Sequence, residues 1–149
     1  MIEVEPCRLA GVLLVRPKRF GDDRGFFTET WNAQRFAAAG IDLGWVQDNL
    51  SRSRDPGTVR GLHYQAPPHA QAKLVRCTRG AIRDVVVDVR RGSPTYGDWL
   101  AFDLDEDGTT QVFVPEGFLH GFVTRVPDTE VTYKCSAFYA PEADGSVRF

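Results

Sequence analysis

Three side chains that can move protons or hold charge lie in short runs of strand-forming residues. They are His63 in "TVRGLHYQ", Lys73 in "AKLVRCTRG" and His120 in "VPEGFLHGF". An imidazole can accept a proton near neutral pH, and an ammonium group can stabilise a neighbouring negative charge. Each also has a plainer interpretation, since single histidines are often structural and a lysine is often exposed on an edge strand. The three side chains can take part in one reaction only if the fold brings them to one cavity.

The composition is typical of a globular protein without a large net charge. The chain has 149 residues, of which 42% are hydrophobic and 26% are charged, and its formal net charge is −2. We expect one domain spanning residues 1–149, and the charge excludes bulk electrostatic binding to nucleic acid or to an anionic membrane. No apolar run is long enough for a membrane span, and the N-terminus lacks the basic region of a secretory signal.

The three cysteines, Cys7, Cys77 and Cys135, lie far apart in the chain. They form no zinc-binding spacing, and free cysteine usually behaves as a small buried hydrophobic residue. We therefore expect three free thiols and a cytoplasmic location, because the cytoplasm is reducing.

Turn-forming residues interrupt the chain often. The segments between them are short and rich in Val, Ile, Leu, Phe, Thr and Tyr, which is typical of a β-sandwich or β-barrel. One helix is expected in "AQRFAAA", with Asn32 as its N-cap and Gly40 just beyond its C-terminal end. The sequence therefore predicts an all-β domain with one short helix.

The run "AIRDVVVDVR" predicts a strand with two different faces. Valines alternate along one face, while Asp84 and Asp88 lie among aliphatic residues on the other. A sheet that lines a partly polar cavity would have this pattern, although a plain solvent-exposed face fits it equally well. Turn residues before this run predict a hairpin with the preceding run, which would set Lys73 opposite Asp84 or Val86.

The pattern PxGxxH in residues 115–120 resembles the second sequence motif of the cupins, which are small double-stranded β-helix jelly rolls. In that motif the histidine points into the barrel, and many cupins bind a metal with it, an HxH pair and a glutamate. Here residues 63–65 offer one histidine where two are needed, His69 lies beyond a Pro-Pro turn, and Lys73 would repel a metal cation. We therefore expect a cupin barrel without a metal site, with a metal-dependent cupin oxygenase as a rival class.

Taken together, six runs resemble the dTDP-4-dehydrorhamnose 3,5-epimerase family in the family's order and over nearly the whole chain. They are "RFGDDRGFFTETW", "QDNLSRS", "VRGLHYQ", "QAKLVRCTRGAIRDVVVDVRRGSPTYGDW", "VPEGFLHGF" and "TYKCSAFYAPEADGSVRF". The resemblance implies a cupin jelly roll and an isomerase that needs no cofactor. The implied reaction inverts C3 and C5 of dTDP-4-keto-6-deoxyglucose, giving dTDP-4-keto-L-rhamnose for dTDP-rhamnose biosynthesis. Both carbons lie beside the C4 ketone, which acidifies their protons.

The resemblance also implies catalytic roles. His63 matches the base, Lys73 the residue that stabilises the enolate, and Tyr133 in "TYKCS" the acid on the opposite face of the sugar. An aspartate in the family's C-terminal segment orients the base, and we expect that segment to be missing here. Asp84 is the candidate substitute, although it is better placed for Lys73. Without the resemblance, Tyr133 would be interpreted as a buried aromatic side chain.

Further residues match positions that bind the nucleotide sugar. Arg24 and Arg60 match contacts to the diphosphate, whose oxygens suit the paired donors of a guanidinium. Tyr139 falls where the family places an aromatic residue near the base, and His120 lines the sugar pocket. Positions around the nucleoside and the sugar are matched by Phe27, Glu29, Gln47 and Asn49.

The family forms homodimers in which N-terminal segments pair with the partner's sheet. Arg24 and Glu29 are therefore expected to serve the neighbouring subunit's site. The expected partners are the dTDP-sugar substrate and a second copy of the chain, with no nucleic acid and no membrane. Three rival functions remain open: an epimerase acting at C3 or C5 only, a 3,4-ketoisomerase on the same class of sugar, and a catalytically inactive nucleotide-sugar-binding homologue.

Overall fold

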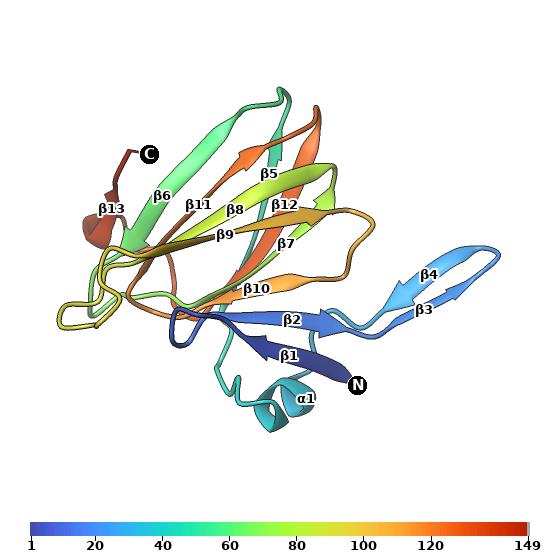
Figure 1. The fold of residues 1–149 in the computed structure, drawn as a ribbon, viewed down its shortest axis with the longest axis horizontal. Coiled ribbons are helices and arrows are strands. Elements are labelled where there is room, and N and C mark those ends of the chain that lie inside the picture. Colours follow the sequence, from blue (N-terminus) through green and yellow to red (C-terminus); the bar gives the residue numbers. More distant parts are fainter. Residues whose placement is uncertain (149) are drawn as a thin grey trace.

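Two antiparallel sheets pack face to face in the computed structural model, which describes residues 1–148 (Figure 1). The six-stranded sheet has the order β1-β2-β10-β7-β12-β5, with bounds Ile2–Pro6, Leu13–Pro17, Gln111–Val114, Lys73–Arg79, Thr129–Cys135 and Gln47–Ser53. The five-stranded sheet has the order β13-β6-β11-β8-β9, with bounds Asp144–Ser146, Val59–Gln65, Phe118–Thr124, Ala81–Asp88 and Trp99–Asp105. This layered all-β architecture confirms the predicted jelly roll.

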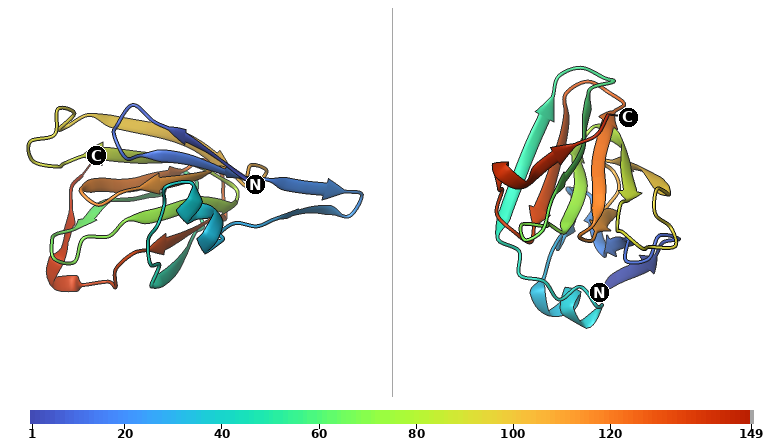
Figure 2. Two further views of the ribbon diagram at one scale, coloured as in Figure 1. Left: turned by 90° about the horizontal axis from the view of Figure 1, so that it is seen from below. Right: turned by 90° about the vertical axis from the view of Figure 1, so that its left-hand side faces the viewer.

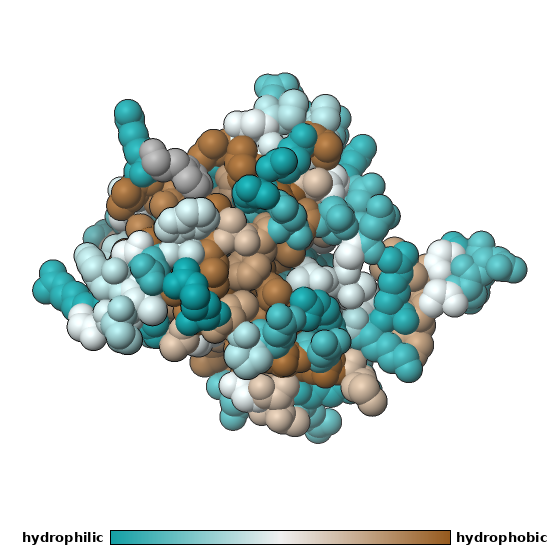
Figure 3. Space-filling model, viewed as in Figure 1, coloured by the Kyte–Doolittle hydropathy of each residue, from teal (hydrophilic) through white to brown (hydrophobic). Residues whose placement is uncertain are grey.

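A hairpin of β3 (Arg19–Asp22) and β4 (Gly25–Thr28) extends away from the sandwich as a two-stranded sheet of its own. Its aromatic side chains Phe20, Phe26 and Phe27 are 51%, 47% and 68% exposed. In the space-filling view of Figure 3 the hairpin projects as a finger with hydrophilic residues at its tip. Within residues 1–148 of one chain, these three aromatic side chains stay about half exposed or more, although the Arg19 guanidinium stacks on the Phe26 ring.

The main hydrophobic core lies between the two sheets. Val75, Val86 and Val131 of β7, β8 and β12 are completely buried there. Burying an aliphatic side chain of this size stabilises the folded state by roughly 1.5–3 kcal/mol. A second cluster, on the outer face of the six-stranded sheet, packs Phe36 against Leu74. The two views in Figure 2 show the layers and the short helix beside them.

The predicted helix is present as α1 (Ala33–Ala38). The side chain of Asn32 accepts a hydrogen bond from the Arg35 backbone N–H at 3.1 Å, as an N-cap does. Gly40 has a φ of +90°, the left-handed conformation that ends many helices. A single 3₁₀ turn, η1 (Pro141–Ala143), precedes β13. No helix in residues 1–148 is long and apolar enough to cross a membrane.

The expected hairpin between β7 and β8 is wrong. β7 pairs with β10 and β12 in the six-stranded sheet, whereas β8 pairs with β11 and β9 in the other sheet. Gly80, with a φ of +77°, lies between them where the chain crosses from one sheet to the other. Lys73 and Asp84 therefore approach each other across the sandwich and not along a shared ladder.

The inner face of β8 carries the two carboxylates. Asp84 and Asp88 are both 0% exposed, while Val85 and Val87 of the opposite face are half-buried. The solvent-face interpretation of the aspartates is therefore wrong, and the alternative of a partly polar interior is correct.

All three cysteines are free thiols, as expected. Cys77 and Cys135 are buried, and Cys7 is half-buried. Burial raises the pKa of the Cys77 thiol to about 11, which keeps it protonated and unreactive at neutral pH.

Candidate active site

A cavity of about 430 Å³ opens between the two sheets at the end of the sandwich where β5 and β6 meet. Its wall is built from β5, β6, β7, β11 and β12, so both sheets contribute to it. The lining residues are Ser51, Val59, Arg60, Gly61, His63, Lys73, His120, Phe122 and Tyr133. Of the residues to which the sequence assigned chemistry, His63, Lys73, His120 and Tyr133 thus lie together.

His63 and His120 face each other as a cross-strand pair of β6 and β11. Beside them, a Cβ atom on Gly61 would lie 2.7 Å from the Cα of Gly121, so only glycine allows the two backbones to approach this closely. The ladder also shifts between His120 and Phe122, as a β-bulge does. The glycine pair and the bulge therefore set the register that brings the two imidazoles side by side.

Asp84 interacts with His120, not with His63. Asp84 Oδ1 lies 2.7 Å from His120 Nε2, and the two side chains are 0% and 5% exposed. The other carboxylate oxygen, Oδ2, is buried and has no hydrogen-bond partner among residues 1–148. Asp84 is therefore not the substitute partner of His63. It lies opposite Phe122 in the ladder of β8 with β11, which sets it diagonally next to His120 on the same face.

Lys73 enters the cavity from the start of β7. Its Nζ atom lies 5.7 Å from the centre of the Tyr133 ring. Burial lowers the pKa of Lys73, while the nearby carboxylate of Asp84 acts in the opposite direction. Asp84 therefore favours the charged form of the lysine, and it does so from the opposite sheet and not as a partner in the predicted hairpin.

His63 has the properties of a base. Partial burial lowers the pKa of His63 below its ordinary value of 6.5, and the charge of Lys73 lowers it further. Asp144 of β13 offsets part of this effect because a carboxylate favours the protonated imidazole. The ring is therefore mostly neutral at pH 7 and can accept a proton.

Tyr133 lines the cavity from β12, in the sheet opposite to His63. Burial raises the pKa of Tyr133 above its ordinary value of 10. The hydroxyl therefore keeps its proton at neutral pH. A proton acceptor and a proton donor thus stand on opposite sides of one cavity.

A second compartment of about 210 Å³ adjoins the first past Lys73 and Tyr133. Gln47, Asn49 and Tyr139 line it, so these predicted nucleotide-binding residues lie together. Gln47 Nε2 donates to Asn49 Oδ1 at 3.0 Å, and the Tyr139 backbone N–H donates to Gln47 Oε1 at 3.0 Å. The side-chain amides therefore have fixed orientations next to the reacting groups.

Asp144 lines this compartment but was not among the predicted site residues. It begins β13, which pairs with β6 and sets Ser146 opposite His63. An acidic residue in the turn-rich segment "PEADGS" gives little local indication that it belongs to a site. Only the long-range pairing of β13 with β6 identifies it.

The remaining predicted residues separate into two groups. Arg60 lines the cavity. Arg24 and Phe27 lie on the β3–β4 hairpin, where the Arg24 side chain is 90% exposed. Glu29 forms a 3.1 Å ion pair with an arginine of α1. One chain alone therefore does not bring Arg24, Phe27 or Glu29 to the cavity that contains His63.

The cavity does not offer a set of metal ligands. Among residues 1–148, no three His, Cys, Asp or Glu side chains converge as metal ligands do. The two cavity histidines lie beside the cation of Lys73, which opposes a second positive charge.

Comparison with known proteins identifies the family. Residues 6–149 match the family model described as dTDP-4-dehydrorhamnose 3,5-epimerase. A dTDP-4-dehydrorhamnose 3,5-epimerase from Sinorhizobium fredii is 51% identical over 141 residues, which are 95% of this chain and 72% of that protein.

Solved structures agree with the sequence comparison. The dTDP-4-dehydrorhamnose 3,5-epimerase of Bacillus anthracis, with TDP and PPi bound, superimposes with a TM-score of 0.98 at 44% identity, covering 100% of this chain and 85% of that one. A dTDP-6-deoxy-D-glucose-3,5-epimerase from Legionella pneumophila, in complex with dTDP-4-keto-L-rhamnose, gives 0.95 at 39% identity, covering 100% and 79%. The chain therefore belongs to the dTDP-4-dehydrorhamnose 3,5-epimerase family, whose members are isomerases with a cupin jelly-roll fold.

Proposed function

We propose that this protein epimerises C3 and C5 of dTDP-4-keto-6-deoxyglucose to give dTDP-4-keto-L-rhamnose. The observation that carries the proposal is the meeting of His63, Lys73 and Tyr133 from both sheets in one cavity. Inversion beside a ketone requires a base, a group that holds the enolate oxygen, and an acid on the opposite face. These three side chains supply one of each, and no cofactor is required.

The proposed reaction begins with removal of a proton by neutral His63. The C–H electron pair moves into a carbon–carbon double bond with C4, and the ketone oxygen becomes an enolate that the Lys73 ammonium stabilises. Tyr133 then delivers its proton to the opposite face of the same carbon, which inverts it. His63 loses the proton it gained to solvent, and Tyr133 regains one. The same sequence at the other carbon completes the double epimerisation.

His120 holds the enolate oxygen together with Lys73 in this proposal. Asp84 binds the Nε2 side of the His120 ring, which leaves the Nδ1 side free for the ligand. Asp84 also favours the positive charge of Lys73. We infer that the catalytic contribution of Asp84 is exerted through these two residues and not through His63.

The nucleotide half of the substrate is proposed to extend into the second compartment. Arg60 binds the diphosphate, while Gln47, Asn49 and Tyr139 contact the nucleoside and the sugar. These assignments are supported by the position of all four residues around the two adjoining compartments. A dTDP sugar bound in this way would reach His63 with its keto sugar.

A second copy of the chain is proposed to complete the site. The β3–β4 hairpin exposes three aromatic side chains, and β5 forms the outer edge of the six-stranded sheet. A partner hairpin added at such an edge would bury those side chains and carry Arg24, Phe27 and Glu29 towards the neighbouring cavity.

Light scattering should give the mass of a dimer, and Phe20→Glu should give a monomer with little activity. A wild-type monomer with full activity would contradict this arrangement.

We propose that the protein is a single cytoplasmic domain acting in dTDP-rhamnose biosynthesis.

The identity of the reaction product tests the proposed function. After incubation with dTDP-4-keto-6-deoxyglucose, proton NMR coupling constants should report inversion at both C3 and C5. Inversion at one carbon would instead define a one-carbon epimerase, and movement of the ketone a 3,4-ketoisomerase. Binding without any conversion would define an inactive homologue and overturn the proposal.

A further inference from the structure

The guanidinium of Arg60 connects the two sheets at the mouth of the cavity. Arg60 belongs to β6 of the five-stranded sheet, and both of its partners belong to β5 of the six-stranded sheet. Its Nε atom donates to Ser53 Oγ at 3.0 Å, and a terminal nitrogen donates to the carbonyl oxygen of Arg52 at 3.1 Å. The side chain is therefore fixed at two points before any ligand binds.

Both acceptors are neutral, so they orient Arg60 without cancelling its charge. Within residues 1–148, no carboxylate lies within ion-pair distance of Arg60. Arg24 and Arg52, by contrast, are paired with Asp22 and Asp128. A guanidinium carries five N–H donors, and two of those of Arg60 are occupied. The other donors and the full positive charge stay available to an anion in the cavity.

Ser53 is placed to hold Arg60 in this orientation. Its side chain is 3% exposed on the inner face of β5, where a buried hydroxyl needs a hydrogen-bond partner. Arg60 provides that partner. An arginine side chain loses much conformational freedom on binding a ligand, and a preformed hydrogen bond means that part of this freedom is already lost in the free protein.

We propose that Ser53 is a positioning residue for the diphosphate of the substrate and acts by holding Arg60 in its binding orientation. This inference rests on the proposed function, because it takes the anion to be the diphosphate of a dTDP sugar. It assigns to Ser53 a share of substrate affinity, although the serine itself does not touch the substrate.

The test compares Ser53→Ala with the wild type by calorimetric titration with dTDP. We expect the dissociation constant to rise about tenfold, as for loss of a hydrogen bond to a charged group. In steady-state assays KM should rise with little change in kcat, since the contact lies away from the reacting carbons. Thymidine, measured by ligand-observed NMR, lacks the diphosphate and should bind both proteins equally.

A matched control exists on the outer face of the same sheet. There Arg76 Nε donates to Thr132 Oγ1 at 3.2 Å, which is the same kind of arginine–hydroxyl bond away from the cavity. Thr132→Ala should leave dTDP affinity unchanged. In a double-mutant cycle, Ser53→Ala should have no further effect on dTDP binding when Arg60 is already alanine.

Two results would overturn the inference while the proposed function stands. One is equal affinity of Ser53→Ala and the wild type for dTDP. The other is that Ser53→Ala loses as much affinity for thymidine as for dTDP. If Ser53→Ala does not fold, Ser53→Cys keeps a similar volume with a weak acceptor, and it should weaken dTDP binding in the same direction. A wild-type protein that converts no keto sugar and does not bind dTDP would contradict the proposed function as well.

Discussion

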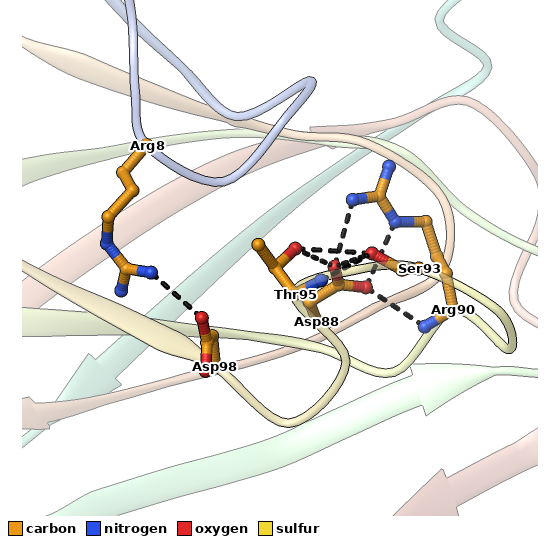
Figure 4. A network of polar contacts seen from close by, with 6 residues as sticks. All are labelled: Arg8, Asp88, Arg90, Ser93, Thr95 and Asp98. Atoms are coloured by element: carbon orange, nitrogen blue, oxygen red, sulfur yellow. Dashed lines mark hydrogen bonds and ion pairs between the residues drawn. The ribbon is translucent and has the colours of Figure 1, made fainter.

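Asp84 and Asp88 lie four residues apart on the same face of β8, and both are completely buried, yet their surroundings differ. Asp88 accepts five hydrogen bonds: three from Arg90, including its backbone N–H, and one each from the hydroxyls of Ser93 and Thr95 (Figure 4). Asp84 has His120 as its partner, and its Oδ2 atom has none among residues 1–148.

The difference separates a structural role at the C-terminal end of β8 from a role beside the active site in the middle of the strand. At Asp88 every lone pair direction has a donor, so the carboxylate fixes the loop between β8 and β9 and leaves nothing for a ligand. At Asp84 a buried carboxylate is only partly satisfied, which costs stability but leaves it free to act on His120 and Lys73 beside the cavity. Burial and residue type are the same, and the number of donors distinguishes the two roles.

The largest effect is expected from Lys73→Met in the cavity beside Asp84. Removing the ammonium that holds the enolate should lower kcat by about 10³-fold. The free energy of unfolding should stay equal or rise, because a cation whose pKa is lowered by burial is removed. Rates of conversion and urea denaturation measure the two quantities. A large loss of stability with the rate preserved would contradict the assignment of Lys73 and Asp84 to the active site and of Asp88 to a structural role.

Asp88→Asn should destabilise the protein by about 3 kcal/mol, because Arg90 and the hydroxyls lose their charged acceptor. The control is Asp98→Asn, which removes an exposed ion pair with Arg8 in the same region and should cost below about 1 kcal/mol. Urea denaturation of both variants measures the contrast. Equal values would show that the buried network has no special contribution.

Asp84→Asn should lower the rate roughly 10- to 100-fold, because His120 loses its charged partner. The unfolding free energy should change by less than about 1 kcal/mol or increase, since an unpartnered buried oxygen is replaced. Kinetics and denaturation on one preparation test this. A stability loss as large as that of Asp88→Asn would remove the distinction between the two aspartates.

The smallest effects concern pH. The pKa of Asp88 is held well below its usual range, chiefly by Arg90, so its contribution to stability is present above about pH 4 and is lost as pH falls further. The stability gap between wild type and Asp88→Asn should therefore narrow in acid. For kcat/KM, the lowered pKa of His63 predicts an acid limb below pH 6.5. The lowered pKa of Lys73, whose charged form is required, predicts an alkaline limb that begins below pH 10.5. An acid limb above pH 6.5 would contradict the assignment of His63 as the base.

Local patterns in the sequence were enough to predict an all-β domain and the helix at Asn32. The resemblance to cupins and to the family supplied the jelly roll, and the strand pattern of residues 81–90 left a polar cavity face and a solvent-exposed face equally open. Local patterns did not predict that β7 and β8 belong to different sheets, because Arg79-Gly80 is compatible with a hairpin and with a crossover alike. The partner of Asp84 also depended on non-local geometry, namely the pairing of β8 with β11.

The family resemblance named His63, Lys73 and Tyr133 for reasons that single-residue patterns could not supply. Ser53 and Asp144 were missed for the same physical reason, since a serine in a strand and an aspartate in a turn acquire a role only through contacts with β6.

The proposed function depends above all on His63, which removes a proton beside the ketone in the cavity between the two sheets. The most direct measurement is solvent exchange: dTDP-4-keto-6-deoxyglucose is incubated with the protein in D₂O, and C3 and C5 are followed by NMR. Deuterium should appear at both carbons with the wild type, and the exchange rate should be lower by about 10³-fold with His63→Ala. Exchange at neither carbon, or exchange that His63→Ala leaves unchanged, would contradict it.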